Sequence, residues 1–354
     1  MKSSQWLLTA SFLASSFALA ACGDDSGPTD GNPGGDGEFV LPADPMNVRR
    51  CPELADNEQM VMAEGFLNEA NQALYSGRFK HEKSYGRDVV GNEDVTQELE
   101  GRYQRGASAL PENFTGVSGE RVQFFLEEDG QWVNVGSSMT GAAGDYTFEI
   151  PAEHQFGVGN HRVLAILEAT GTCNEHGVFV WPAETQSMIT DIDGTMTSTD
   201  AEFIRQLSDV NYVPEQNINA STMMQAWEAK GYASIYLTAR PNEFRWLSRI
   251  WLREQGFPYG PMETAETFVA GATAREYKGA FVRYLNDLQI DLVAAYGNAE
   301  SDVQAYDDGG IPLDITFTIN EAAGMNGTIA VPNGDWTSHI SEFVSGMPTV
   351  DNGF

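Results

Sequence analysis

The sequence predicts two folded domains, an antiparallel β-sandwich followed by a doubly wound α/β domain with a parallel sheet. Between residues 80 and 182, short runs of β-forming residues are separated by glycine turns, which is typical of a sandwich. From residue 186 onward, apolar strands alternate with amphipathic helices, which indicates a parallel sheet covered by helices on both faces.

The sandwich is expected over residues 80–182, after a helical segment over residues 51–79. Its expected strands are 122–126, 146–150, 161–167 and 178–181. Residues 57–75 place Met60, Phe66 and Leu74 at helical spacing, so we expect a short amphipathic helix there.

The α/β domain is expected over residues 183–354. Its expected strands are 188–190, 234–237, 292–296 and 315–319, and its expected helices are 221–230, 241–255 and 275–288. In an open parallel sheet the ligand crevice lies outside the carboxyl ends of the strands. Asp191, Thr238 and Asn298 each fall at or just after such an end, so we expect them to meet in one crevice.

Two carboxylates, Asp191 and Asp193, stand one residue apart directly after the apolar run 188–190. The alternation of a strand would send them to opposite faces, so the chain must leave strand geometry at Asp193, which Gly194 permits. Both groups can then face one phosphate, with the first as nucleophile and the second as general acid and base. A calcium loop or a solvated turn also uses such a pair, so the pair alone leaves these alternatives open.

The sequence Asp191-Ile-Asp-Gly-Thr195 after a hydrophobic strand resembles motif I of the haloacid-dehalogenase superfamily, and four partners follow in the expected order: Thr238, Lys278, Asn298 and Asp302. Four longer stretches are similar to the catalytic domain of lipins, which are magnesium-dependent phosphatidate phosphatases: 191–200, 231–240, 256–261 and 296–306. This resemblance covers residues 183 to about 345 and implies a Rossmann-like haloacid-dehalogenase fold.

Three further features bear on that resemblance. Residues 80–182 resemble the immunoglobulin-like β-domain that precedes related catalytic domains in bacterial and fungal phosphatidate phosphatases. Motif II reads Leu-Thr-Ala-Arg over 237–240, with Thr238 where many lipins have serine, so the hydroxyl is kept. No large insertion separates Asp193 from Thr238, which indicates a minimal cap and an uncovered crevice suited to a large or membrane-bound substrate.

The resemblance implies a role for each candidate residue. Asp191 and Asp193 would be catalytic, as nucleophile and as general acid and base. Residues implied to bind the substrate phosphate are Gly194, Thr195, Thr238, Arg240 and Lys278, and those implied to bind Mg²⁺ are Asp191, Asp193, Asn298 and Asp302. The alternatives are helix capping for Thr238 and Asn298, a surface cation for Arg240 and a solvated helix position for Lys278.

The N-terminus predicts membrane attachment. Residues 1–21 contain an apolar run that ends in Leu-Ala-Ala before Cys22, which resembles a bacterial lipoprotein signal, and an ordinary signal peptide cleaved near Ala21 is the alternative. Residues 22–50 are acidic and rich in glycine and proline, so we expect a flexible tether. The expected location is the bacterial cell envelope, with Gly23 favouring the outer membrane, on its periplasmic or surface side.

Cysteine usage and charge narrow the possible partners. In an oxidising compartment Cys51 and Cys173 are expected to form a disulfide, with two free thiols as the alternative. The formal net charge of −31 argues against a nucleic-acid partner.

These observations predict a Mg²⁺-dependent phosphatase that hydrolyses phosphatidate through an aspartyl-phosphate on Asp191. One alternative is a phosphatidate-binding module without turnover, like the lipin-like domains at the end of some phosphatidylinositol-transfer proteins. Another is a phosphatase for a different phosphomonoester. Protein partners cannot be assigned from the sequence.

Overall fold

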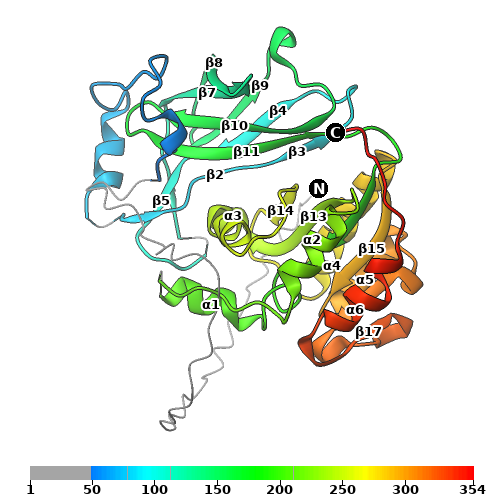
Figure 1. The fold of residues 1–354 in the computed structure, drawn as a ribbon. Helices are drawn as coiled ribbons and strands as arrows, with labels where there is room; N and C mark the ends of the chain where they lie inside the picture. The colour runs from blue at the N-terminus through cyan, green and yellow to red at the C-terminus, as the bar shows by residue number, and fades with distance from the viewer. Residues whose placement is uncertain (1–48, 78, 112, 210) are drawn as a thin grey trace, which may run out of the picture. The chain divides into compact units, whose positions relative to one another are not determined.

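The computed structural model describes residues 49–354, apart from residues 78, 112 and 210. The expected signal peptide, the lipidation site at Cys22 and nearly all of the tether lie outside these residues. Within the described part, a β-sandwich is followed by a six-stranded parallel sheet with helices on both faces, so the expected fold class is confirmed (Figure 1).

The sandwich contains a five-stranded sheet in the order β3-β11-β10-β7-β8 and two three-stranded sheets, β2-β4-β9 and β1-β5-β6. Its strands are β1 (His81–Glu82), β2 (Tyr85–Gly86), β3 (Val89–Gly91), β4 (Glu98–Arg102), β5 (Gln104–Gly106), β6 (Thr115–Gly116), β7 (Arg121–Glu128), β8 (Gln131–Met139), β9 (Asp145–Glu149), β10 (Gly159–Leu167) and β11 (Thr172–Val180). All four strands expected from the sequence are present. The pairing is antiparallel except between β11 and β3, which run parallel.

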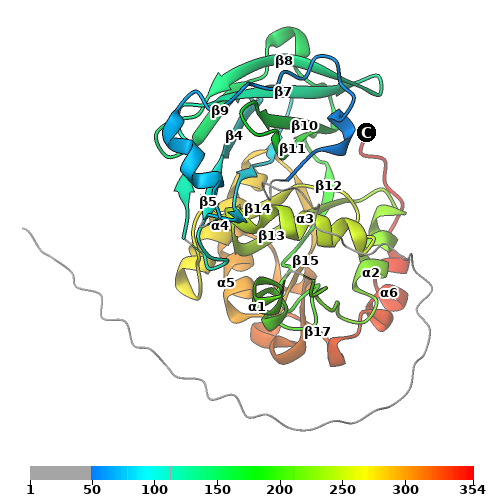
Figure 2. The same cartoon turned by 90° about the vertical axis from the view of Figure 1, so that its left-hand side faces the viewer.

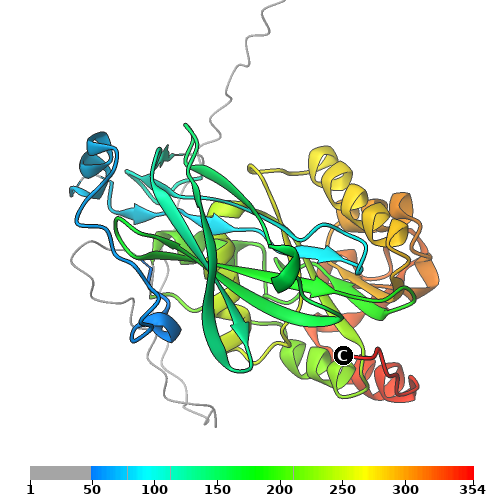
Figure 3. The same cartoon turned by 90° about the horizontal axis from the view of Figure 1, so that it is seen from above.

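Both faces of the long strands β7 and β10 are buried. Phe124 and Val163 belong to the main core of the sandwich, whereas the next residues along, Phe125 and Leu164, contact the N-terminal segment. Figure 3 shows this segment, in blue, beside the long green strands. A disulfide joins Cys51 of this segment to Cys173 of β11, with 5.7 Å between the Cα atoms.

The prediction of an amphipathic helix over residues 57–75 is wrong for most of that range. Only a 3₁₀ helix, η2 (Glu69–Tyr75), forms there, and a second short one, η1 (Pro52–Leu54), lies near the disulfide. The intervening backbone binds sandwich side chains: Glu120 accepts hydrogen bonds from the amides of Leu67 and Asn68 (3.0 Å each). Tertiary hydrogen bonds therefore replace the helical ones, and the apolar spacing reflects contacts of an irregular segment.

The parallel sheet has the strand order β14-β13-β12-β15-β16-β17. Its strands are β12 (Gln186–Thr190), β13 (Ala233–Pro241), β14 (Met262–Ala265), β15 (Asp291–Gly297), β16 (Thr316–Ile319) and β17 (Ile329–Val331). Its helices are α1 (Ala201–Ser208), α2 (Ala220–Glu228), α3 (Arg245–Glu254), α4 (Ala272–Asp287), α5 (Glu300–Gly309) and α6 (Thr337–Glu342). The expected strands and helices are present, and the additional elements are β14, β17, α1, α5 and α6.

Side chains of β12 alternate between two cores, as expected for a strand covered on both faces. Met188 packs with residues of α2 and α3, whereas Ile189 packs with residues of α4. The second core also contains Phe179, which lies in β11 of the sandwich, and Trp181, which follows that strand, so apolar side chains of the two domains share one core. No helix in the described part of the chain is long and apolar enough to cross a membrane.

Candidate active site

Asp191 lies directly after β12, in the middle of the parallel sheet. Its amide donates a hydrogen bond to the carbonyl of Tyr296 in β15 (3.0 Å), which fixes where the strand ends. The chain then turns at Gly194, whose φ is +69°. A Cβ at Gly194 would lie 2.0 Å from Asn298 Nδ2 and 2.5 Å from Asp200 Oδ1, so this position needs glycine for conformation and for space.

Lys278 joins two buried carboxylates beneath this turn. Its Nζ donates to Asp191 Oδ1 (2.5 Å) and to Asp302 Oδ1 (2.7 Å), and all three side chains are at least 95% buried. Because α4 carries Lys278 on its buried face, the sequence alternative of a solvated lysine does not apply. One buried cation therefore serves two carboxylates, and the cluster keeps an excess negative charge.

The pKa values of this cluster reflect that imbalance. Burial raises the pKa of Asp191 to about 8, and Asp302 and Asp193 act in the same direction against the opposing ammonium of Lys278. Burial alone would lower the pKa of Lys278, but the two carboxylates more than offset it and raise that pKa. A further cation near Asp191 would favour its ionised form.

Asp193 is turned toward Arg240. Arg240 donates from Nη2 to Asp193 Oδ1 (2.7 Å) and from Nε to Asp193 Oδ2 (2.9 Å), and Thr238 Oγ1 donates to the same Oδ2 (3.3 Å). Arg240 is buried and is held by Ser248 Oγ of α3 (2.9 Å), so the surface-cation alternative does not apply to it. The Asp193 side chain is 21% exposed, which places it at the open side of the site.

Asn298 and Asp302 occupy different positions after β15. Asp302 Oδ2 accepts hydrogen bonds from the amides of Asn298 (3.2 Å) and Ala299 (3.1 Å), and its other oxygen binds Lys278. Both of its oxygens therefore have donors, and Asp302 caps α5 while it holds Lys278. Asn298 is half-buried at the open side, with its amide nitrogen bound to Asp200 (3.0 Å).

The oxygens that face the open side suit a hard cation. Thr195 Oγ1 lies 3.3 Å from Asp191 Oδ2 and 3.2 Å from Asn298 Oδ1, and its single proton cannot satisfy both. Among the described residues, no three His, Cys, Asp or Glu side chains are placed to hold one ion. A carboxylate with an amide oxygen, completed by water or phosphate, is a set that Mg²⁺ accepts, so these residues fit the expected ion.

Gly194 and Thr195, expected to bind the substrate phosphate, make contacts within the turn. The amide of Gly194 donates to Thr197 Oγ1 (2.9 Å), and the hydroxyl of Thr195 faces Asp191 and Asn298. Both residues shape the turn in this structure.

The sequence did not reveal three residues that hold this turn in place. Asn217 Nδ2 binds the carbonyls of Thr195 (2.8 Å) and Thr197 (2.9 Å), and Asn320 Nδ2 binds the carbonyl of Gly194 (2.8 Å). Asp200 begins α1, which starts at this edge of the sheet (Figure 2). Asn320 directly follows β16, so its position at a strand end was a usable signal, whereas Asn217 lies in an irregular segment without one.

Two family models match this chain. Residues 83–180 match the model described as PITM 1-3, beta-sandwich domain, and residues 188–320 match the model described as PITM 1-3, LNS2 domain. The second match contains Asp191, Asp193, Thr238, Lys278 and the region of Asn298.

Curated relatives include membrane-associated phosphatidylinositol transfer protein 3 of Mus musculus, 26% identical over 66% of this chain and 23% of its own length. The protein retinal degeneration B of Drosophila melanogaster is 24% identical over 72% of this chain and 20% of its own length. The chain thus spans less than a quarter of the length of these relatives.

Solved structures with some likeness include a D,D-heptose 1,7-bisphosphate phosphatase from B. bronchiseptica, complexed with magnesium and phosphate. It has a TM-score of 0.34 and 13% identity, and the match covers 46% of this chain and 99% of that one. An apo phosphoserine phosphatase has a TM-score of 0.29 and 10% identity, with 45% and 99% covered. By these two matches, the chain is similar to a β-sandwich domain followed by an LNS2 domain.

Proposed function

We propose that this protein is a Mg²⁺-dependent phosphatase that hydrolyses the phosphomonoester of phosphatidate. The observation that carries this proposal is the arrangement at Asp191: one carboxylate oxygen is held by Lys278 (2.5 Å), and the other lies 3.3 Å from the hydroxyl of Thr195, which also neighbours Asn298. A carboxylate that a cation holds in one orientation is suited to attack phosphorus.

In the proposed reaction, Asp191 attacks phosphorus while the bond from phosphorus to the lipid oxygen breaks. Asp193 gives a proton to the departing oxygen, which yields diacylglycerol and an aspartyl-phosphate. Asp193 then takes a proton from a water that attacks phosphorus, the bond to Asp191 breaks and inorganic phosphate leaves. For this, the Asp193 carboxyl must turn from Arg240 toward the substrate, and its partly exposed position gives it room.

Asp191 and Asn298 would hold the Mg²⁺ ion, which neutralises charge on the phosphate when bound. Lys278 would hold Asp191 in place and offset the charge of the incoming phosphate. Thr238 and Arg240, which now bind Asp193, would contact phosphoryl oxygens once Asp193 turns away.

Three features support a membrane lipid as the substrate. In the described part of the segment between Asp193 and α2, the short helix α1 is flanked by loops and no cap domain is present. The relatives are named as membrane-associated phosphatidylinositol transfer proteins. A lipid anchor at Cys22 would hold the enzyme near its substrate and raise the local concentration.

A phosphatidate-binding module without turnover is the second candidate. The names of the relatives favour it, since they describe lipid transfer, and so does the tight hold of Arg240 on Asp193. The intact Asp191 and Asp193 favour the enzyme.

The deciding experiment measures phosphate release from phosphatidate in mixed micelles, with Mg²⁺ or with EDTA, for the native chain and Asp191→Asn. We expect release that needs Mg²⁺ and is lost in the variant. Retained phosphatidate binding without release from the native chain would establish the binding module. Release from soluble phosphomonoesters but not from phosphatidate would keep the chemistry and change the substrate.

A further inference from the structure

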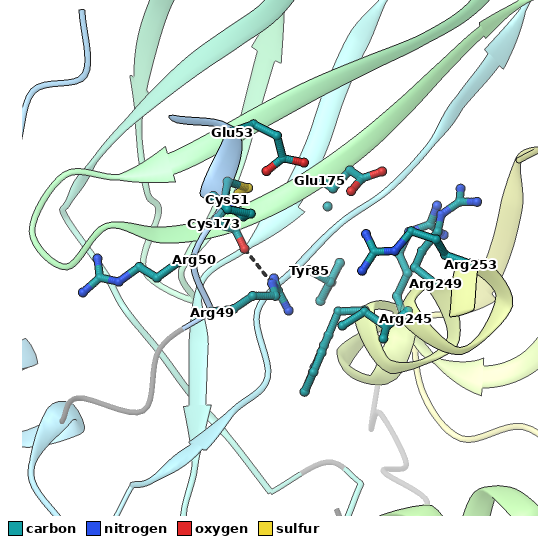
Figure 4. A pocket seen from close by; sticks show the side chains of 14 residues that line it. Arg49, Arg50, Cys51, Glu53, Tyr85, Cys173, Glu175, Arg245, Arg249 and Arg253 are labelled. Atoms are coloured by element: carbon teal, nitrogen blue, oxygen red, sulfur yellow. Dashed lines mark hydrogen bonds between the residues drawn. A yellow bond between two sulfur atoms is a disulfide. The ribbon is translucent and has the colours of Figure 1, made fainter. Parts of the chain in front are cut away.

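A second pocket lies between the sandwich and α3. It has a volume of about 160 Å³ and is lined from one side by Arg49 and residues near the disulfide, and from the other by α3. Figure 4 shows arginine side chains from these two sides, with Arg50 directed away from the others. None of its lining residues belongs to the candidate active site.

The pocket gathers positive charge in a strongly acidic chain. Five of the 20 lysines and arginines of the sequence line it: Arg49, Arg50, Arg245, Arg249 and Arg253. The three from α3 are spaced by four residues, so they lie along one face of the helix.

The two carboxylates that line the pocket are shared with a further arginine outside its lining. Glu53 and Glu175 also line the pocket, but both bind Arg162 (3.0 and 3.2 Å). Asp88, whose side chain is 3% exposed, is shared between Arg245 and Arg249. This buried trio therefore carries a net positive charge.

The pKa of Asp88 is consistent with a negative charge on its carboxylate. Burial tends to raise it, but Arg245 and Arg249 overcome burial and hold the pKa below its usual range. Asp88 is thus ionised, and both of its oxygens already pair with Arg245 and Arg249. It does not compensate the charge of the other arginines of the pocket.

Buried donors of the pocket are left without acceptors. Arg49 Nη1 and the indole Nε1 of Trp246 are both buried, and neither has a hydrogen-bond partner among the described residues. Burial lowers the pKa of Arg49, and the carboxylates Glu82 and Glu175 act in the opposite direction. Arg253 is exposed at the rim and forms no ion pair within the described part of the chain. A buried donor without an acceptor is costly, which favours an acceptor that binds from outside.

We infer that this pocket is a second binding site, separate from the active site, for a phosphate group of a lipid headgroup or of a small soluble molecule. Guanidinium groups bind phosphate oxygens in pairs and in a fixed geometry, and several of them converge here with an indole donor. The volume admits a group of phosphate or glycerophosphate size, since one water needs only about 10–15 Å³ on the same measure. The inference does not depend on catalysis at Asp191.

The test needs a signal from this pocket alone, because phosphate also binds at a phosphatase active site. The indole N–H resonance of Trp246 provides it, and Trp246→Phe identifies that resonance by its loss. The full-length protein is titrated with inorganic phosphate at constant ionic strength, with chloride as the replacement anion. We expect the resonance to shift with phosphate and not with chloride.

Two variants then assign the effect to the arginines. Arg253→Gln removes an exposed charge at the rim without disturbing the core. It should raise the dissociation constant for phosphate, read from the Trp246 resonance, by about tenfold. Arg283→Gln is the matched control, since it removes an exposed arginine of α4 that does not line this pocket. A Trp246 resonance that does not move at saturating phosphate, or equal binding by both variants, would overturn the inference.

A second arm distinguishes the sources of phosphate. Phosphatidylcholine vesicles with and without phosphatidate are added to the native protein and to Arg253→Gln. A change at Trp246 that needs phosphatidate and is weakened in Arg253→Gln identifies a lipid headgroup as ligand. A response to inorganic phosphate alone identifies a soluble phosphate compound, and no response in either arm rejects the site. Phosphatase activity is measured separately, so failure of the proposed activity and failure of the proposed binding site can be told apart.

Discussion

The active site and the arginine pocket are each built around a buried group of three charges, and the two groups have opposite sign. In the active site one cation, Lys278, lies between Asp191 and Asp302. Beside the pocket one anion, Asp88, lies between Arg245 and Arg249. The first group has excess negative charge and suits a metal cation, whereas the second has excess positive charge and suits an anion. The single central charge decides which ligand each place can take.

The largest effect is expected from Lys278→Met, which removes the central charge of the active site. Asp191 and Asp302 would remain buried without their shared cation, and loss of one partner of a buried ion pair costs about 3–5 kcal/mol. Urea unfolding followed by circular dichroism would measure this change. Lys230→Met is the control: among the described residues Lys230 Nζ donates to the carbonyl of Met347 (2.6 Å) and forms no ion pair, so this substitution should cost about 1 kcal/mol or less. Equal losses in both variants would show that the Lys278 cluster does not hold the fold.

The corresponding change beside the pocket is Asp88→Asn. It leaves two buried arginines without a carboxylate and weakens a link between domains, because Asp88 also accepts hydrogen bonds from the amides of Gly177 in β11 and Met262 in β14 (2.8 Å each). We expect the free energy of unfolding to fall by about 3 kcal/mol.

Asp94→Asn, six positions along the chain, is exposed and serves as the control for this change. The same unfolding measurement applies to both variants. If Asp88→Asn were as stable as the control, Asp88 would not be the structural counterpart of Lys278.

The two regions also differ in how far the sequence predicts them. The active-site residues follow strands of one parallel sheet, and the rule that ligands bind at the carboxyl ends brings Asp191, Thr238 and Asn298 together. Lys278 and Arg240 entered through the resemblance to a known motif order, and the structure places both against the two aspartates. The sequence did not predict that Asp302 binds Lys278 while Asn298 lies at the open side of the site. This difference depends on side-chain orientation, which the spacing of residues does not determine.

The arginine pocket could not be predicted from strand ends or from a known motif order. Its residues come from segments more than a hundred positions apart, joined by the disulfide of Cys51 with Cys173 and by the contact of the domains. Only the spacing of arginines along α3 was visible in the sequence, and solvated helices share that pattern. The helix predicted over residues 57–75 is wrong for a similar reason: a side chain distant in the sequence, Glu120, accepts hydrogen bonds from the backbone of this segment. The roles of the catalytic residues, the anchor at Cys22 and the cellular location remain predictions.

A glycine substitution tests how strictly the active-site turn is shaped. In Gly194→Ala, the new methyl group would collide with Asn298 and Asp200, in addition to the cost of a positive φ. We expect phosphate release to fall by about a hundredfold, since a displacement of about 1 Å has effects of that order.

Gly130→Ala is the matched control for this change. Gly130 has a similar φ of +74°, but a Cβ there meets no atom within 4 Å. It should lose comparable stability and keep activity. Similar activity losses in both variants would trace the effect to backbone strain rather than to the crowding of Asn298.

The smallest expected effect is a pH dependence on the sandwich side, at His176. Burial lowers the pKa of His176 to about 4, and its ring contacts the carbonyl of Arg87 (2.7 Å) and the hydroxyl of Tyr146 (2.9 Å). In the unfolded chain its pKa is about 6.5, so between these values the unfolded state binds more protons. The stability that neutral His176 supports is therefore complete above about pH 6.5 and is lost as the pH falls toward 4. Between about pH 7.5 and pH 5 this amounts to about 2 kcal/mol.

Urea unfolding at both pH values, for the native chain and His176→Gln, isolates this contribution from those of the carboxylates. The native chain should lose about 2 kcal/mol more than the variant on acidification. An equal loss would mean that His176 is not held neutral. Because His176 lies close to Asp88 and Arg245, its protonation adds positive charge where positive charge is already in excess. Acidification should thus act on the arginine side of the molecule through His176, whose folded-state pKa of about 4 lies below the tested range.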